Sequence, residues 1–224
     1  MNKINIAIDG PSGAGKSTIA KLLANKLNYI HIDTGAMYRA VALKCTMNSI
    51  DLNDENSINN ILNDTNITFA TNGDTYLDDI NVSDKIRTNE MSLLASEVSK
   101  ILSVRNYLVQ QQQLMSKEKG YILDGRDIGT VVLKDAEVKV FLTATSNARA
   151  QRRNQQNIEK NIESNIEKIE IEIKQRDYQD TNRSNSPLRQ AEDAILIDSS
   201  DLTIEEVVNK ILEMIKGIGL WLVV

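Results

Sequence analysis

A glycine-rich segment near the N-terminus has the residue types and spacing of a phosphate-binding loop. Residues 10–17 read GPSGAGKS and fit the pattern G-x-x-x-x-G-K-[ST], between an apolar run and a helix-like stretch. In such a loop, backbone N–H groups and the N-terminus of the following helix surround phosphate oxygens. Lys16 would reach the β- and γ-phosphates, and the Ser17 hydroxyl would bind Mg²⁺. We therefore expect a magnesium-bound nucleoside triphosphate, contacted by Gly10, Pro11, Ser12, Gly13, Ala14, Gly15, Lys16, Ser17 and Thr18.

Three further motifs would lie at the same edge of the fold as this loop. Residues 33–39 (DTGAMYR) and 124–130 (DGRDIGT) each follow a predicted strand, and ligands of α/β sheets bind at the carboxyl ends of strands. Residues 176–183 (RDYQDTNR) precede the fifth predicted strand. These motifs and a cluster at 149–153 hold seven of the ten arginines, namely Arg39, Arg126, Arg149, Arg152, Arg153, Arg176 and Arg183. Because guanidinium groups bind phosphate at two points and spread positive charge, the arginines indicate phosphoryl transfer to a second, anionic ligand.

The composition argues against several other classes of protein. The chain has 224 residues, a net charge of -5 and 25% charged residues, as in ordinary globular domains. A general nucleic-acid binder is usually basic, and a bilayer span needs about 18 consecutive apolar residues, which the sequence lacks. Cys45 is the only cysteine, so no intrachain disulfide can form. We expect a cytoplasmic monomer with no nucleic-acid or membrane partner.

Alternating strand and helix signals surround the motifs. Short apolar runs predict five core strands, at residues 4–8, 29–33, 121–123, 138–142 and 194–197. Helical spacing predicts helices at residues 19–27, 37–47 and 146–153. It also predicts one long helix with a single apolar side made of Leu93, Leu94, Val98, Ile101 and Leu102. Strands that alternate with helices predict a parallel sheet covered on both faces.

Three segments outside the core sheet have patterns of their own. Asn72-Gly73, between two short apolar runs, predicts a small hairpin. Residues 154–174 are polar, with isoleucines at 162, 166, 169 and 173, which predicts a mobile amphipathic helical lobe. Thr203 and Glu206 have the spacing of a capping box for the last helix.

Together, the motifs resemble those of the bacterial cytidylate kinase family. The resemblance runs from residue 4 to about residue 215 and rests on five segments: GPSGAGKST (10–18), DTGAMYRA (33–40), DGRDIGTVV (124–132), RAQRR (149–153) and RDYQDTNR with SPL (176–188). It implies an α/β fold, a P-loop three-layer sandwich with a five-stranded parallel sheet, a monophosphate-binding lobe with a small β insert, and a helical lid. One kinase domain would span residues 1–224, with the core at about 1–36, 100–150 and 184–216, the lobe at 37–99 and the lid at 151–178.

The resemblance also implies roles for individual side chains. The phosphate of CMP would be held by Arg39, Arg126 and Arg183, with Thr34 beside it. The ribose would be bound by Asp180 with Arg176 nearby, and the cytosine ring by Ser96, Arg105 and Asp127. The ATP phosphates would be reached by the lid arginines Arg149, Arg152 and Arg153. Mg²⁺ would be supported by Ser17 and, through water, by Asp124. Charge on the transferred group would be balanced by Lys16, Arg126, Arg153 and Arg183.

The implied reaction is transfer of the γ-phosphoryl group of ATP to CMP, and also to dCMP, giving ADP with CDP or dCDP. Two other functions remain open on the sequence. One is a related kinase with another acceptor, either UMP or an alcohol. An alcohol needs a base beside its hydroxyl, whereas three separated arginines favour a monophosphate. The other is a nucleotide-gated switch, but the sequence has no N-K-x-D segment to read guanine.

Three positions depart from the family pattern. Lys134 stands where a proline is common, and Asn161 stands where a glycine of the lid is usual. The apolar tail at residues 217–224 matches nothing in the family. We expect this tail to dock on the protein's own body or to form a subunit contact.

Overall fold

The computed structural model describes residues 3–70, 73–159 and 161–217, which form two compact units. The first unit consists of Met1–Tyr29 and Lys119–Val224, and the second of Ile30–Glu118. Asn72 of the predicted turn and the tail beyond Gly217 lie outside the described residues. In the part of the chain that is described, no helix is both long enough and apolar enough to cross a bilayer.

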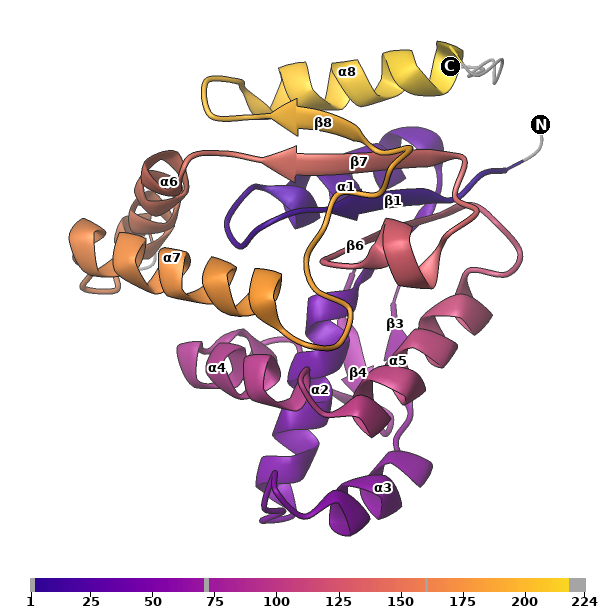
Figure 1. Ribbon diagram of the computed structural model, residues 1–224, viewed down its shortest axis with the longest axis vertical. Helices are drawn as coiled ribbons and strands as arrows, with labels where there is room; N and C mark the ends of the chain where they lie inside the picture. Colours follow the sequence, from indigo (N-terminus) through magenta and orange to yellow (C-terminus); the bar gives the residue numbers. More distant parts are fainter. Residues whose placement is uncertain (1–2, 71–72, 160, 218–224) are drawn as a thin grey trace. The chain divides into compact units, whose positions relative to one another are not determined.

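The main sheet has five strands in the order β2-β6-β1-β7-β8. The central strand β1 (Ile6–Asp9) pairs in parallel with β6 (Tyr121–Gly125) and β7 (Val138–Thr143), and β7 pairs in parallel with β8 (Ile195–Asp198) (Figure 1). The outer strand beside β6 is β2 (Ile30–Asp33). The predicted five-stranded α/β sheet is confirmed. Asp9 lies opposite Gly125, so the P-loop and the DGRDIGT motif leave the sheet at one edge.

Two helices of the first unit share a core with this sheet. α1 (Lys16–Leu27) directly follows the P-loop, and α8 (Ile204–Gly217) follows β8. Their buried apolar residues pack on alternate residues of the strands, including Ile6, Ile8, Val140 and Leu142. At the start of α8, the Thr203 N–H donates to the Glu206 carboxylate and the Glu206 N–H donates to Thr203 Oγ1, which confirms the predicted capping box.

The segment predicted as a lid consists of two helices that pack against each other, α6 (Ser146–Glu159) and α7 (Ile166–Asn182) (Figure 1). Their shared cluster consists of Ala150, Ile169 and Ile173. Ile162 and Ile166 are 49% and 38% exposed. Of the four isoleucines predicted to form one apolar face, only Ile169 and Ile173 are buried, where α7 packs against α6.

The backbone at the end of α6 explains one departure from the family pattern. Asn161 has φ +55°, a left-handed conformation that favours glycine and that asparagine tolerates better than other residues. Its N–H donates to the Ile158 carbonyl, and the Ile162 N–H donates to the Asn157 carbonyl. This is the hydrogen-bond pair of a Schellman motif, in which glycine is the usual residue.

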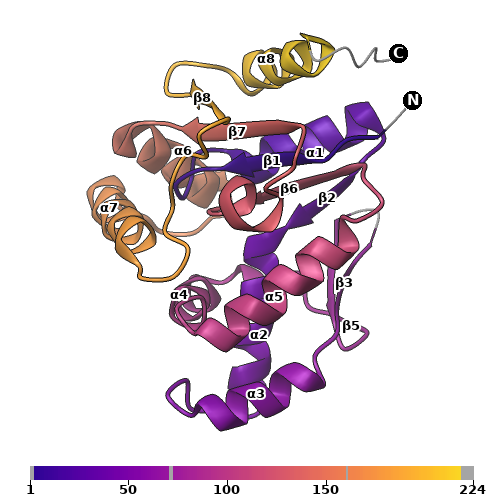
Figure 2. The ribbon, with the colours of Figure 1, turned by 45° about the vertical axis from the view of Figure 1, so that its right-hand side comes forward.

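The second unit combines helices with a small antiparallel sheet. α2 (Thr34–Met47) packs against α4 (Asn89–Val98) and α5 (Leu102–Met115), and α3 (Glu55–Asn63) packs against α5 (Figure 2). The sheet consists of β3 (Ile67–Phe69), β4 (Thr75–Leu77) and β5 (Ile80–Asn81), followed by a 3₁₀ turn at Lys85–Arg87. The predicted hairpin is confirmed by the antiparallel pairing of β3 with β4.

The prediction of one long helix after this sheet was wrong. The chain leaves helical geometry between α4 and α5, and Ile101 has extended dihedral angles. The two helices point in different directions (Figure 2). As a result Leu93 and Leu102, expected on one apolar side, are 72% and 56% exposed.

Candidate active site

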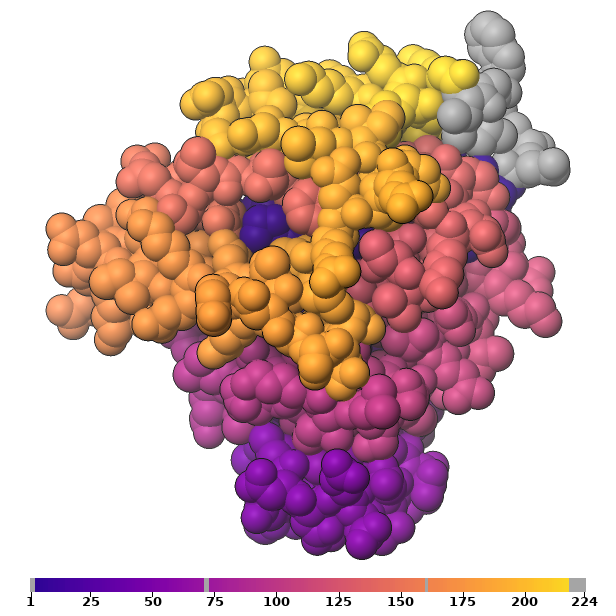
Figure 3. Space-filling model, viewed as in Figure 1, coloured from indigo at the N-terminus to yellow at the C-terminus, as the bar shows by residue number. Residues whose placement is uncertain are grey.

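The P-loop begins directly after Asp9, the last residue of β1, and ends at the start of α1. Gly10 has φ +150°, and a Cβ atom added to it would lie 1.9 Å from the Leu142 carbonyl oxygen of β7. Gly13 has φ +77° and lies against the side chain of Arg149. Only glycine fits both the backbone conformation and the close approach at Gly10. In Figure 3, N-terminal atoms lie at the floor of a hollow rimmed by the chain from β7 to β8, where Figure 1 shows the loop between β1 and α1.

Lys16 is buried at the centre of this loop, and its Nζ donates to the Pro11 carbonyl at 2.8 Å. Burial, together with repulsion from Arg126, lowers the pKa of Lys16 from 10.5 to about 7, although Asp124, Asp180 and Asp9 attract its charge. A buried ammonium group is a strong electrostatic partner for an incoming anion.

Ser17 and Asp124 form the oxygen-donor pair of the site. The Ser17 hydroxyl donates to Asp124 Oδ2 at 2.8 Å, and Asp124 lies near the end of β6, opposite Ile8 of β1. A hydroxyl and a carboxylate are hard oxygen ligands of the kind that Mg²⁺ takes in phosphate sites, where most other ligands are waters and phosphate oxygens. The two side chains therefore fit the predicted metal.

The structure brings the DGRDIGT and RDYQDTNR motifs together in the first unit. Arg126 Nε donates to Asp180 Oδ2 at 2.7 Å, and Arg183 Nη2 lies 3.6 Å from Asp127 Oδ1. Burial raises the pKa of Asp180, but attraction by Arg126, Arg176 and Arg183 outweighs it and lowers the pKa overall. The Arg183 Nε also donates to the Ser186 carbonyl at 2.7 Å. These pairs hold two guanidinium groups in fixed orientations.

The three arginines of α6 differ in how far they are exposed. Arg149 is buried, donates to the Ser12 and Ala144 carbonyls at 2.9 Å each, and pairs with Asp177 at 2.7 Å. Arg149 thus ties both lid helices to the P-loop.

The other two arginines of this cluster differ in their surroundings. Arg152 donates to the Ser199 carbonyl and to its hydroxyl, while Arg153 is exposed. Thr18, the last residue of the predicted ATP contact set, is also exposed.

The remaining predicted residues belong to the second unit. Asp33 accepts from the Ala36 N–H at the start of α2 and from Arg39 Nη2, both at 2.9 Å. Burial raises the pKa of Asp33, but Arg39, His31 and the Ala36 amide outweigh it and lower the pKa overall. Thr34 is the first residue of α2 and is buried. Asp33 therefore orients Arg39, which lies six residues further along the chain in α2.

Ser96 and Arg105 are connected through Ser99, at the break between α4 and α5. Arg105 is buried, donates to the Ser99 carbonyl at 3.2 Å, and lies 5.7 Å from the centre of the Tyr38 ring. The Ser99 hydroxyl donates to the Ser96 carbonyl at 2.8 Å. The geometry that contradicts the long-helix prediction is thus what links these two residues.

Sequence reasoning missed several residues that position this site. Asp9 accepts two backbone amides, Asp177 pairs with Arg149, and Ser199 holds Arg152. Asp9 could have been found as a carboxylate at the carboxyl end of a predicted strand. Ser199 and Asp177 carry no such signal.

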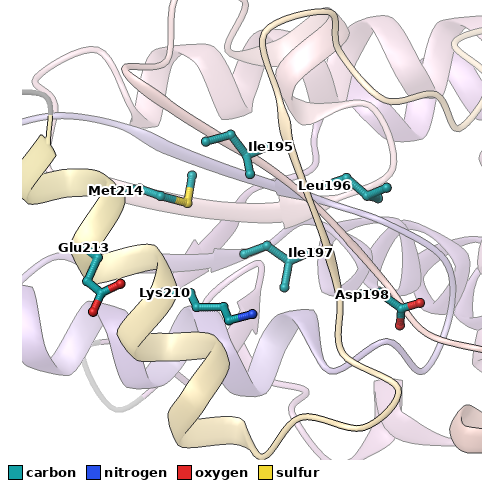
Figure 4. Close-up of a pocket in the computed structure, with 7 residues that line it drawn as sticks. All are labelled: Ile195, Leu196, Ile197, Asp198, Lys210, Glu213 and Met214. Atoms are coloured by element: carbon teal, nitrogen blue, oxygen red, sulfur yellow. The ribbon is translucent and has the colours of Figure 1, made fainter.

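A separate groove lies between β8 and α8, with a volume of about 350 Å³ (Figure 4). Its lining consists of Ile195, Leu196, Ile197, Asp198, Lys210, Glu213 and Met214. None of these belongs to the P-loop or the arginine motifs, so the groove is not the candidate site.

Comparisons with known proteins agree with the motifs. A sequence model described as cytidylate kinase matches residues 6–217. The cytidylate kinase of Caldicellulosiruptor bescii is 55% identical over 217 residues, 96% of each chain. That of Bacteroides thetaiotaomicron is 50% identical over 214 residues, covering 92% of this chain and 93% of the relative.

Solved structures of other kinases share the fold. Shikimate kinase from Bacteroides thetaiotaomicron has a TM-score of 0.51 at 13% identity, covering 95% of this chain and 98% of its own. A gluconokinase from Sinorhizobium meliloti has a TM-score of 0.50 at 12% identity, covering 97% of this chain and 94% of its own. Because the family's sequence model matches residues 6–217 and the relatives are 50–55% identical over nearly the whole chain, this chain belongs to the cytidylate kinase family.

Proposed function

We propose that this protein transfers the γ-phosphoryl group of ATP to CMP and dCMP, forming ADP with CDP or dCDP. The observation that carries the proposal is the set of charges in the first unit. The P-loop, with buried Lys16, shares one sheet edge with Arg126, which is held by Asp180 at 2.7 Å. Family membership supports the same reaction.

The donor end of the reaction belongs to the P-loop. Its backbone N–H groups bind the ATP phosphates, and Lys16 balances charge that develops between the β- and γ-phosphates. Ser17 and Asp124 would hold Mg²⁺, Asp124 through water, and the ion supplies charge neutralisation at the phosphates. Arg149, Arg152 and Arg153 of α6 are the lid arginines that we assign to these phosphates. Arg149 and Arg152 have protein partners in this structure that they would exchange for phosphate oxygens.

The acceptor end needs cations and no catalytic base. The phosphate of CMP is already an anion, so attack on the γ-phosphorus requires orientation and charge balance alone. We assign the CMP phosphate to Arg39, Arg126 and Arg183, with Thr34 beside it. In this structure each of the three arginines is held near a carboxylate, which keeps its guanidinium group oriented for a planar, two-point contact.

The ribose and the base would be bound by the remaining polar groups. Asp180, in the field of Arg176, accepts hydrogen bonds from ribose hydroxyls. Asp127 accepts from the cytosine amino group, and Arg105 donates to the ring acceptors. Uracil would present an acceptor to the carboxylate and a donor to the guanidinium group. Ser96 can donate or accept, so it orients the base without selecting it.

We further propose that the protein acts as a monomer in the cytoplasm. A monophosphate kinase needs no second subunit when one chain supplies both phosphate sites. The one cysteine is buried and free, as suits a reducing compartment. Light scattering during gel filtration would test the monomer directly, and a mass of twice 25.0 kDa would refute it.

The experiment that tests the reaction identifies its products. Purified protein is incubated with MgATP and CMP, and nucleotides are separated by ion-exchange chromatography. We expect ADP and CDP in equal amounts, and little ADP when CMP is left out. ADP formed at the same slow rate with and without CMP would instead indicate a nucleotide-gated switch.

A further inference from the structure

Asp9, the last residue of β1, is a buried carboxylate that the proposed reaction does not use. Its side chain accepts two backbone hydrogen bonds, from the Ile128 N–H to Oδ1 and from the Gly129 N–H to Oδ2, each at 2.7 Å. Only 4% of the residue is exposed. Both oxygens therefore have a specific partner more than a hundred residues away in the chain.

The two amides belong to the turn that directly follows Arg126 and Asp127 of the DGRDIGT motif. Residues Ile128–Val132 form a single π-helical turn, and the first amides of any helix have no partner within it. Asp9 supplies that partner. An added Cβ on Gly129 would lie 3.4 Å from Asp9 Oδ2, so the turn is in direct contact with the carboxylate.

A charged group at this position is costly, and neighbouring charges reduce the cost only in part. Burial raises the pKa of Asp9 to about 6, although the Gly129 and Ile128 amides and Lys16 favour the ionised form and Asp127 opposes it. Buried polar groups that remain despite such a cost are frequently found at functional sites.

The location of Asp9 connects the two ends of the reaction. Gly10, the first residue of the P-loop, follows Asp9 directly, and Arg126 and Asp127 directly precede the turn that Asp9 holds. A shift of this turn would move both side chains relative to the P-loop. Two hydrogen bonds accepted by one carboxylate thus link the donor loop to the acceptor loop, beside the strand pairing of Asp9 with Gly125.

We propose that Asp9 is a positioning residue: by holding the Ile128 and Gly129 amides, it sets the spacing between the P-loop and the loop that carries Arg126 and Asp127, and so supports both turnover and selection of CMP over UMP. This inference rests on the proposed function. It assigns Asp9 no contact with either substrate.

The opposite end of the same strand offers a matched control. The Glu137 carboxylate accepts the Asn5 N–H at 2.9 Å and pairs with Lys119 at 2.7 Å, remote from the P-loop. Glu137→Gln therefore weakens a carboxylate-to-amide contact beside β1 without touching the site. Asp9→Asn makes the equivalent change at the site, because an amide side chain can accept with only one of its two ends.

The experiment compares the two variants by kcat, by KM for ATP and CMP, and by the ratio of kcat/KM for CMP over UMP. For Asp9→Asn we expect kcat to fall at least tenfold and the ratio at least fivefold, since misplacement of about 1 Å can cost on the order of 10² in rate. KM for ATP should change less than threefold. Glu137→Gln should change kcat and the ratio less than twofold, even if both variants melt at lower temperature.

Several results would overturn the proposal. One is a folded Asp9→Asn protein whose kcat and CMP preference match those of Glu137→Gln. Asp9→Ser, which keeps one acceptor oxygen in a smaller side chain, replaces Asp9→Asn if that variant does not fold. If neither folds, Asp9 is a folding residue and the positioning role is rejected. Lack of CMP kinase activity in the wild type would refute the proposed function itself.

Discussion

Replacing Lys16 with methionine should lower kcat strongly and also change how stability depends on pH. Methionine has a similar length and no charge, so the variant loses the cation that balances the transferred phosphoryl group. Loss of one preorganised group of this kind costs roughly 10²–10³ in kcat. The stability effect is separate, because burial and Arg126 lower the pKa of Lys16 from 10.5 to about 7 in the folded protein.

The sign of the stability effect follows from where the Lys16 proton is held. Between pH 7 and pH 10.5 the unfolded chain keeps this proton and the folded protein has lost it, so stability of the wild type rises with pH in this window. Below pH 7 both states hold the proton, and the full penalty of the buried charge remains. At about 1.4 kcal/mol per pH unit, the wild type should gain on the order of 2 kcal/mol over Lys16→Met between pH 7 and pH 9.

The assay is guanidinium denaturation without nucleotide at pH 7, 8 and 9. Lys21→Met is the matched control, because Lys21 is exposed on the same helix. The difference in unfolding free energy between wild type and Lys16→Met should grow with pH, while the difference for Lys21→Met should stay constant. If both differences in unfolding free energy are independent of pH, the folded protein does not disfavour the charged form of Lys16.

Three further predictions concern the backbone and the lid. Gly10→Ala should lower the melting temperature by about 10 °C, because its Cβ would lie 1.9 Å from the Leu142 carbonyl oxygen; Gly15→Ala, which is strained by φ +94° but has no atom within 4 Å of its Cβ, should cost less in the same thermal melts. Asn161→Val should speed hydrogen exchange at the Ile162 amide by about tenfold and Asn161→Gly should not, because a β-branched residue at φ +55° costs roughly 1–2 kcal/mol. Trypsin should cut residues 154–174 in the free protein and more slowly with a bisubstrate analogue, because closure of the lid would protect them; equal rates would argue against closure.

The sequence alone was sufficient to predict the features of the fold that depend on a local pattern of residues. The P-loop follows a strand and opens a helix because Gly10 and Gly13 allow backbone conformations that other residues resist. The capping box at Thr203 depends on residues three positions apart. Core strands such as β1 and β7 were found because their apolar runs are short and bounded.

Features that depend on distant partners could not be predicted in this way. The break between α4 and α5 contains Ser99, Lys100 and Ile101, with no proline or glycine to mark it. Arg149 has the residue type of a phosphate ligand, but Asp177 and two carbonyls hold it in this structure. The partners of Asp9 are backbone amides, which any sequence would supply, so only the fold reveals them.

The most direct test of the account is the ratio of kcat/KM for CMP over UMP, measured in the wild type and in Asp127→Ala. Two mismatched polar contacts, each worth about 1–3 kcal/mol, predict a wild-type ratio on the order of 10³. In Asp127→Ala the ratio should fall sharply, mainly through loss of activity on CMP. A wild-type ratio near one, or an unchanged ratio in a folded Asp127→Ala protein, would contradict the base-reading site and the acceptor assigned to it.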